Sequence, residues 1–210
     1  MPQPIENAIP DVVILRLPLY VRALAQLHDS DTEVVSSHAL GEKLQITPAQ
    51  IRKDLSYFGR FGKQGRGYNV LYLLSELKSI MGLNQEWRAA LIGMGRLGRA
   101  IISYPGFARE GFHIVAVFDA NPALVGTEID GVPVRDMAQL DRIISEQRIH
   151  IGIVAVPEEH AQAVVDQLVK CEVKGILNYA PISPQVPEGV WIRNIDPVLS
   201  LQTLTFHLKG

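Results

Sequence analysis

The stretch that decides the fold is Gly93-Met94-Gly95-Arg96-Leu97-Gly98, which follows the apolar run Ala89–Ile92. Glycines at this spacing, between a strand and a helix, are typical of a dinucleotide-binding fold. Gly93 permits the tight turn, Gly95 lets the backbone approach a pyrophosphate, and Gly98 lets the helix pack closely on the strand. The motif therefore predicts a phosphate site at the start of a helix, where free N–H groups attract anions.

Asp119 lies 21 residues after Gly98, at the end of the next apolar run. A carboxylate at this place accepts a hydrogen bond from a ribose 2′-hydroxyl and repels a 2′-phosphate, so we expect NAD(H) rather than NADP(H). Arg96 can add a charge-assisted contact to a phosphate, and Leu97 lies beside it in the same turn. The alternative is a structural glycine turn in a domain that binds another ligand or none.

Apolar runs alternate with helical patterns from Trp87 onward. This alternation predicts a Rossmann-type, doubly wound parallel sheet with helices on both faces. The expected strands are 89–92, 114–118, 151–156, 175–177 and 190–192, and the expected helices are 96–104, 137–147 and 159–171.

Ligands of such sheets bind beyond the carboxyl ends of the strands. The loops after the third and fourth strands should therefore line the cofactor crevice. Their candidate cofactor-binding residues are Val156, Pro157, Asn178, Ala180 and Pro181. These residues are mostly apolar, which suits recognition of a nicotinamide ring better than hydride chemistry on a polar substrate.

Working outward toward the N-terminus, Thr47-Pro48-Ala49-Gln50 is a strong helix start. Threonine caps the helix, proline fits its first position, and the Gln50 side chain is expected to reach back to the cap. A shorter helix capped by Ser36 or Ser37 precedes it, and the spacing is that of a helix-turn-helix. An earlier helix is expected from about Pro18 to Gln26, since proline fits a first turn.

The second helix of the pair carries the candidate DNA-reading residues. We expect Gln50, Arg52 and Lys53 to contact base edges in the major groove, and Ser56 and Tyr57 to bind backbone phosphate.

A glycine-punctuated segment from Gly59 to Gly67 follows and predicts a hairpin, so the whole is a winged-helix domain. Its basic residues are Arg60, Lys63 and Arg66, which can track phosphates or enter a minor groove. The net charge of the whole chain is -2, yet residues 43–66 hold six basic residues and one acid. A local basic face is enough to attract nucleic acid. The alternative is a three-helix packing module with a basic rim.

The composition excludes other classes. The chain has 210 residues, of which 47% are hydrophobic and 20% charged, as in ordinary globular proteins. No apolar run could span a bilayer, and the first residues lack the pattern of a signal peptide. Cys171 is the single cysteine, so we expect a reduced, cytoplasmic location. The six histidines have no metal-ligand spacing, and no pair suited to proton transfer is evident, so we expect neither a metal nor an enzyme.

The domains are therefore expected at residues 1–82 for DNA, 83–196 for the cofactor, and 197–210 for an apolar helix that must be buried somewhere. Such a chain suggests a sensor in which cofactor binding changes DNA binding. Two alternatives stay open: a dehydrogenase whose N-terminal domain serves dimerisation, and a regulator that responds to CoA or another nucleotide.

The chain closely resembles the Rex family of redox-sensing transcriptional repressors. The resemblance rests on Arg52-Lys53-Asp54-Leu55-Ser56-Tyr57-Phe58-Gly59, Gly65-x-Gly67-Tyr68, the glycine motif at 93–98, Tyr104-Pro105-Gly106-Phe107, and Gly175-Ile176-Leu177-Asn178-Tyr179-Ala180-Pro181. It implies a homodimer that binds double-stranded operator DNA and is released by NADH, with NAD+ as a weaker competitor. It also implies a C-terminal helix exchanged between partners and a polar link between the domains through Arg22, Tyr104 and Asp196.

Overall fold

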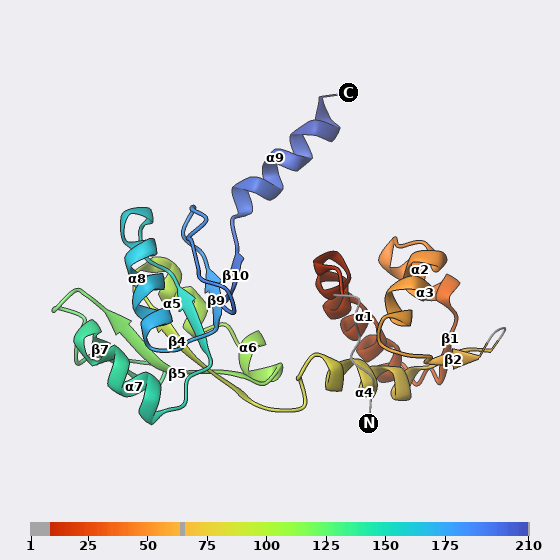
Figure 1. The fold of residues 1–210 in the computed structure, drawn as a ribbon, viewed down its shortest axis with the longest axis horizontal. Helices are drawn as coiled ribbons and strands as arrows, with labels where there is room; N and C mark the ends of the chain where they lie inside the picture. Colours follow the sequence, from red (N-terminus) through yellow and green to blue (C-terminus); the bar gives the residue numbers. More distant parts are fainter. Residues whose placement is uncertain (1–8, 64–65, 210) are drawn as a thin grey trace. The chain divides into compact units, whose positions relative to one another are not determined.

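A computed structural model describes residues 9–63 and 66–209 of the chain. The chain divides into two compact units, Met1–Gln85 and Glu86–Gly210. The segment that connects them runs from the last helix of the first unit to the first strand of the second (Figure 1). Within the described ranges no helix is long and apolar enough to cross a membrane.

The first unit is a winged helix. Its elements in chain order are α1 (Asp11–Asp29), β1 (Val34–Val35), α2 (Ser37–Leu44), α3 (Pro48–Ser56), β2 (Gly62–Lys63), β3 (Gly67–Asn69) and α4 (Val70–Ile80). The strands form a small antiparallel sheet in the order β1-β3-β2. Helices α2 and α3 are the helix-turn-helix, and β2 with β3 is the wing.

Local chemistry explains the turn between α2 and α3. Ser36 caps α2 by accepting a hydrogen bond from the backbone N–H of Ala39, and Thr47 caps α3 in the same way from Gln50. Gln45 takes a left-handed backbone conformation at the end of α2, with φ of 56°. A Cβ at Gly41 would collide with the carbonyl oxygen of Ile46, so the close approach of the chain at this turn requires glycine.

The expected start of the first helix at Pro18 is wrong. Helix α1 begins at Asp11 and contains Pro18 in its interior. Proline removes one helical hydrogen bond, but Val13 and Leu17 before it are buried in the core. Burying an aliphatic side chain contributes about 1.5–3 kcal/mol, which is enough to keep the first turns helical through the proline.

The second unit is built on one sheet with the strand order β10-β9-β8-β4-β5-β7-β6. Its strands are β4 (Trp87–Ile92), β5 (Phe112–Asp119), β6 (Glu128–Ile129), β7 (Val132–Asp136), β8 (Ile151–Val154), β9 (Gly175–Asn178) and β10 (Trp191–Asn194), and only β6 pairs antiparallel. Its helices are α5 (Arg96–Ile102), α6 (Gly106–Arg109), η1 (Met137–Gln139), α7 (Leu140–Glu146), α8 (Glu158–Lys170) and α9 (Pro197–Leu208).

This order confirms the predicted fold class. The chain runs outward from β4 to β5 and β7, then returns to β8 and continues to β9 and β10 on the other side. The direction of winding reverses between β4 and β8, and doubly wound folds bind dinucleotides at this reversal.

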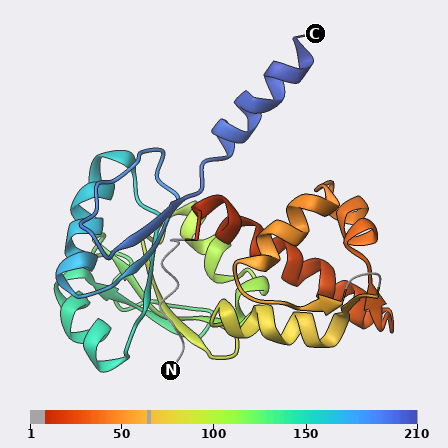
Figure 2. The ribbon, with the colours of Figure 1, turned by 45° about the vertical axis from the view of Figure 1, so that its right-hand side comes forward.

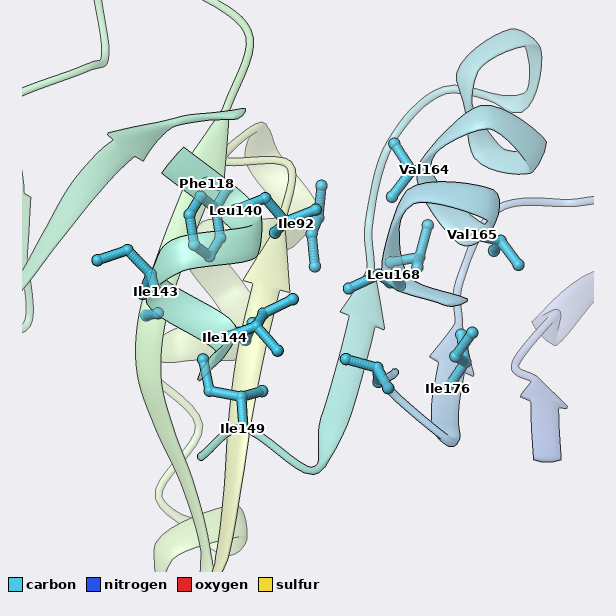
Figure 3. Close-up of a cluster of buried hydrophobic side chains, with 14 of the residues drawn as sticks. Ile92, Phe118, Leu140, Ile143, Ile144, Ile149, Val164, Val165, Leu168 and Ile176 are labelled. Carbon is cyan, nitrogen blue, oxygen red and sulfur yellow. The ribbon is translucent and has the colours of Figure 1, made fainter. Parts of the chain in front are cut away.

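Helices cover both faces of the sheet. On one face α7 and α8 contribute Ile143, Val165 and Leu168 to a core with Ile92 and Phe118 of the strands (Figure 3). On the other face Ile101 of α5 packs with a second set of strand residues. The core thus fixes the strand ends from which the site residues project.

Three short elements of the second unit were not predicted from the sequence. Strand β7 contains Pro133 and two charged residues, so it lacks the apolar run that marked the other strands. Strand β6 and helix α6 have two and four residues, which is too short for a periodic pattern. The predicted helix 137–147 is divided into η1 and α7.

Helix α9 has no buried residue. It extends away from the sheet of its own unit (Figures 1 and 2), and Phe206 and Leu208 are 78% and 83% exposed. Side chains of this kind are normally removed from water, so α9 offers an apolar surface to another chain or segment.

Candidate functional site

The glycine motif forms the turn between β4 and α5. Gly93 has φ of +99°, and a Cβ there would lie 2.5 Å from the carbonyl oxygen of Ala155. A Cβ at Gly98 would collide with the carbonyl oxygen of Gly93, because α5 packs directly on the turn. A Cβ at Gly95 would have no neighbour within 4 Å. Gly93 and Gly98 are therefore glycine for reasons internal to the fold, whereas the space at Gly95 is open to a ligand.

Asp119 holds the turn in place. One carboxylate oxygen accepts a hydrogen bond of 2.6 Å from the backbone N–H of Met94, and the other accepts one of 2.7 Å from Asn121. Each carboxylate oxygen can accept further hydrogen bonds, so the side chain ties the end of β5 to the glycine turn and still offers acceptor positions to a ribose.

A pocket of about 320 Å³ lies beside this turn. It is lined by four predicted residues besides Asp119: Gly93, Gly95, Val156 and Pro157. Its lining residues that were not predicted from the sequence include Asn121, Leu124, Met137 and His160. They come from the segment after β5, from η1 and from α8, and no motif marks them. The pocket has the size of a small-molecule site.

The remaining predicted residues do not line this pocket. Arg96 and Leu97 are exposed on the first turn of α5, Gly98 is buried beneath it, and Pro181 is exposed. Ala180 is buried.

Asn178 has a role inside the protein. It is fully buried; its Nδ2 atom donates to the carbonyl oxygens of Ala180 and Ile182, and its Oδ1 atom accepts from the N–H of Ala180. Nδ2 also lies 2.9 Å from Oδ1 of Asn194 on β10. These contacts occupy both donor hydrogens of the amide. The side chain therefore shapes the loop after β9.

In the first unit, a groove lies between α3, the start of α2 and the wing. Arg52, Ser56 and Arg60 line it together with Ser36 and Ser37. The guanidinium of Arg52 donates to the hydroxyl of Ser37 over 2.9 Å. Two cations and the N-terminus of α2 thus line one groove, an arrangement that favours an anion such as phosphate. The two serines were predicted only as helix caps.

The other predicted DNA-binding residues lie around this groove. Lys53 is exposed on α3, and Tyr57 is half-buried at its end. The hydroxyl of Ser56 donates to the carbonyl oxygen of Lys53, which engages its one hydrogen. Arg66 is exposed before β3. Lys63 lies on β2, and its side chain is outside the described residues, as is the predicted motif residue Gly65.

Asp54 of α3 is completely buried. Its carboxylate accepts hydrogen bonds from Arg16 Nε at 2.5 Å and Nη2 at 2.8 Å, from the Tyr20 hydroxyl at 2.5 Å, and from Gln50 Nε2 at 2.6 Å. Burial by itself raises the pKa of Asp54, but the hydrogen bonds from Arg16, Tyr20 and Gln50 outweigh it and hold the pKa below its ordinary value. The expected contact of Gln50 with the helix cap is therefore wrong, because its amide is bound to Asp54.

The three residues expected to link the domains differ in their surroundings. Arg22 is exposed on α1. Tyr104 is 60% exposed and stacks edge to face on Phe107. Asp196 caps α9 by accepting a hydrogen bond of 2.8 Å from the N–H of Val198. Among the described residues, no group of three or more histidine, cysteine, aspartate or glutamate side chains could hold a metal ion.

Known proteins match the chain along almost its whole length. A repressor from Roseiflexus sp. named "Redox-sensing transcriptional repressor Rex" is 53% identical over 199 residues, which are 95% of this chain and 90% of the relative. The chain belongs to the Rex family. The Rex proteins of Clostridium novyi and Streptomyces coelicolor are 46% and 41% identical, over 94% and 96% of this chain and 94% and 78% of their own lengths.

Family models and solved structures agree with this assignment. Residues 8–56 match the model described as a putative DNA-binding protein N-terminus, and residues 84–182 match the model described as a CoA binding domain. The crystal structure of RSP with β-NAD+ and operator DNA has a TM-score of 0.91 and 40% identity, covering 97% of this chain and 94% of its own. The crystal structure of RSP with β-NADH has a TM-score of 0.87 and 38% identity, and the match covers 97% of this chain and 95% of that chain.

Proposed function

We propose that the protein is a redox-sensing transcriptional repressor that binds operator DNA as a homodimer and is released when NADH binds. The observation that carries the proposal is the presence, in one Rex-family chain, of a basic groove on a winged helix and a glycine-turn pocket at the reversal of a doubly wound sheet. The name of the family states the same role, and its members are repressors rather than enzymes.

The pocket beside the glycine turn suits one half of NAD(H). The open space at Gly95 admits a pyrophosphate against the backbone, with Arg96 near enough in sequence to add a positive charge. Asp119 would accept from a ribose hydroxyl, and Val156 with Pro157 would contact an apolar ring. The nicotinamide at the other end of the cofactor distinguishes the two redox forms, since only its oxidised ring carries a positive charge. Ala180 and Pro181 would lie on the nicotinamide side, on the loop that Asn178 shapes.

Residues 1–82 would bind the operator. Arg60 and Ser56 line the groove and would bind backbone phosphate with Tyr57. Gln50, Arg52 and Lys53 on α3 would read base edges. Lys63 and Arg66 would extend the contact along the wing. A repressor acts where the chromosome lies, so the proposal places the protein in the cytoplasm, and no role in it requires a metal or a membrane.

Residues 83–196 would bind the cofactor, and residues 197–210 would be exchanged between two copies. The exposed apolar surface of α9 supports this exchange, since no part of its own unit covers it. In such a dimer Arg22, Tyr104 and Asp196 would form the polar link that changes between the two states. A dimer suits a palindromic operator, whose half-sites lie about 34 Å apart or at a multiple of that spacing.

The test is a binding titration on operator DNA at fixed salt, with NADH or NAD+ added. Salt must be fixed because it alone changes such affinities steeply. We expect NADH to release the protein and NAD+ to compete for the same site without releasing it. Operator binding that saturating NADH leaves unchanged would contradict the proposal.

A second candidate is a regulator that responds to CoA, because residues 84–182 match a CoA binding domain model. Competition among NADH, NADPH and CoA for the pocket separates the two functions. We expect NADH to displace the others; tight binding of CoA that NADH fails to displace would favour the second candidate.

A further inference from the structure

The buried carboxylate of Asp54 joins the recognition helix to α1. Arg16 and Tyr20 lie on α1, whereas Asp54 and Gln50 lie on α3, one helical turn apart. Four hydrogen bonds from three side chains converge on one carboxylate that has no contact with solvent. The DNA-binding surface described above does not use Asp54, Arg16 or Tyr20.

Stability alone is a weak reason for such a group. Removing charges from water costs free energy, and an apolar pair of the same size often stabilises a core as well or better. The ion pair instead fixes an orientation, because an arginine guanidinium binds a carboxylate in one plane through two parallel hydrogen bonds. The pair therefore fixes the rotation of α3 about its own axis relative to α1.

The network also fixes the amide of Gln50. An ionised carboxylate only accepts hydrogen bonds, so the atom of Gln50 that faces Asp54 must be the NH₂ group. The carbonyl oxygen Oε1 and one remaining hydrogen are then the groups left for DNA. A glutamine that pairs with adenine uses one acceptor and one donor. Gln50 thus keeps one acceptor and one donor for a base, and its hydrogen bond to Asp54 fixes the orientation of its amide.

We propose that Asp54 is a positioning residue for operator recognition: held by Arg16 and Tyr20, it sets the rotation of α3 and presents the Gln50 amide to a base in one orientation. The inference rests on the proposed operator binding and adds a buried determinant of specificity to it. Asp54 itself touches no DNA.

The experiment compares two duplexes of the same length. One is the operator that the wild-type protein selects from a library of random duplexes, and the other is a shuffled sequence of the same composition. For Asp54→Asn we expect about a tenfold loss on the operator, which is the scale of one well-placed base contact, and a change of less than about twofold on the shuffled duplex. Asp29→Asn is the matched control, because it removes the same charge from an exposed position near the end of α1, and we expect both affinities to stay unchanged.

Coupling between the two residues of α3 separates positioning from a general loss of structure. If Asp54 acts through Gln50, the losses of Gln50→Ala and Asp54→Asn on the operator do not add in the double variant. Library selection with Asp54→Asn should also yield sequences with relaxed preference at the same base pair as selection with Gln50→Ala.

A second variant covers the case in which Asp54→Asn does not fold. Arg16→Met combined with Asp54→Leu removes both charges together, so that no buried charge is left unpaired. We expect this variant to unfold near the wild-type temperature and bind the shuffled duplex normally, yet to lose the preference for the operator.

The outcomes are distinct. Wild-type protein that selects no operator would contradict the proposed function. Wild-type protein that selects one, while folded variants keep the preference or lose affinity equally for both duplexes, would overturn the role of Asp54 alone.

Discussion

The three glycines of the motif at the turn between β4 and α5 have different surroundings. Substitutions can therefore separate a role in cofactor binding from a role in packing. Gly95 has φ of -71° and no neighbour within 4 Å of a Cβ, so alanine fits there without strain. We expect Gly95→Ala to keep the unfolding temperature or raise it slightly, and to weaken NADH binding at least about tenfold, a change of about 1.4 kcal/mol. Calorimetric titration with NADH and thermal unfolding measure the two effects.

Gly98→Ala is the internal comparison. A Cβ there collides with the carbonyl oxygen of Gly93, and an added methyl group in a packed region costs about 1–3 kcal/mol. Gly98→Ala should lower the unfolding temperature, whereas Gly95→Ala should weaken NADH binding. Equal NADH binding by Gly95→Ala and wild type would mean that the cofactor does not approach this turn.

Asp119→Ala tests the choice of cofactor. The carboxylate repels a 2′-phosphate, so its loss should weaken NADH and narrow the preference for NADH over NADPH. Stability should also fall by about 1–3 kcal/mol, because the N–H groups of Met94 and Asn121 lose their acceptor. The exposed Glu188 provides a control, as Glu188→Ala removes a charge from the same unit. An unchanged ratio of NADH to NADPH affinity in Asp119→Ala would remove the residue from the ribose site.

Individual residues show why part of the site was predictable. The glycine spacing and Asp119 follow from backbone geometry, which a motif records directly. Gln50 and Asn178 were assigned to ligands because their amides can bind them. The structure also gives each amide a partner inside the protein that no motif indicates: Asp54 for Gln50, and Ala180 for Asn178. The partner of Gln50 is 4 residues away, and those of Asn178 are 2, 4 and 16 residues away. The sequence does not indicate with which of its neighbours a polar side chain forms hydrogen bonds. His160 and Met137 come to the pocket from separate elements and carry no signal in sequence.

At the scale of elements, the contact between α1 and α3 makes stability depend on pH. The pKa of Asp54 is lowered from its ordinary value of 3.8. A group with a lowered pKa contributes stability above its unfolded pKa, and this contribution is lost as the pH falls through the folded value. The wild type should therefore exceed Asp54→Asn in stability at neutral pH, and the gap should close as the pH falls below about 3.8.

Chemical unfolding of both proteins along a pH series measures this gap. A gap that stays constant down to the most acidic pH at which both proteins fold would mean that Asp54 is not ionised in the native state.

The elements that sequence indicated well are those with long patterns. The capped helices α2 and α3 and the apolar strands β4, β5, β8 and β9 were expected close to their observed ranges. Strand β7 was missed because Pro133, Arg135 and Asp136 leave it without a continuous apolar run. It joins the sheet as a neighbour of β5, which no local pattern indicates. The start of α1 was misplaced because burial of Val13 and Leu17 outweighs the preference of Pro18 for a first turn.

For the whole molecule, the surface of α9 should hold two copies together. Leu201 is 61% exposed, and an anchor side chain at the centre of an interface contributes about 2 kcal/mol or more. We expect Leu201→Glu to raise the dimer dissociation constant at least about tenfold, as measured by light scattering across a dilution series. Gln202→Glu adds the same charge at a neighbouring polar position and should leave the dimer intact. A Leu201→Glu protein that remains dimeric at all concentrations would mean that another surface forms the dimer.

The proposed switch requires that DNA and NADH prefer different states of one dimer. A ligand shifts such an equilibrium only by its difference in affinity for the two states. The coupling is reciprocal, so the factor by which NADH weakens the operator must equal the factor by which the operator weakens NADH. Neither factor follows from the geometry of the DNA-binding or the cofactor-binding site taken alone.

The most direct measurement is therefore the dissociation constant of NADH with and without saturating operator duplex, at one salt concentration. The account predicts a weaker NADH affinity on the operator, by the same factor with which NADH lowers operator affinity and typically about 5–150-fold. An NADH dissociation constant that the operator leaves unchanged would contradict it.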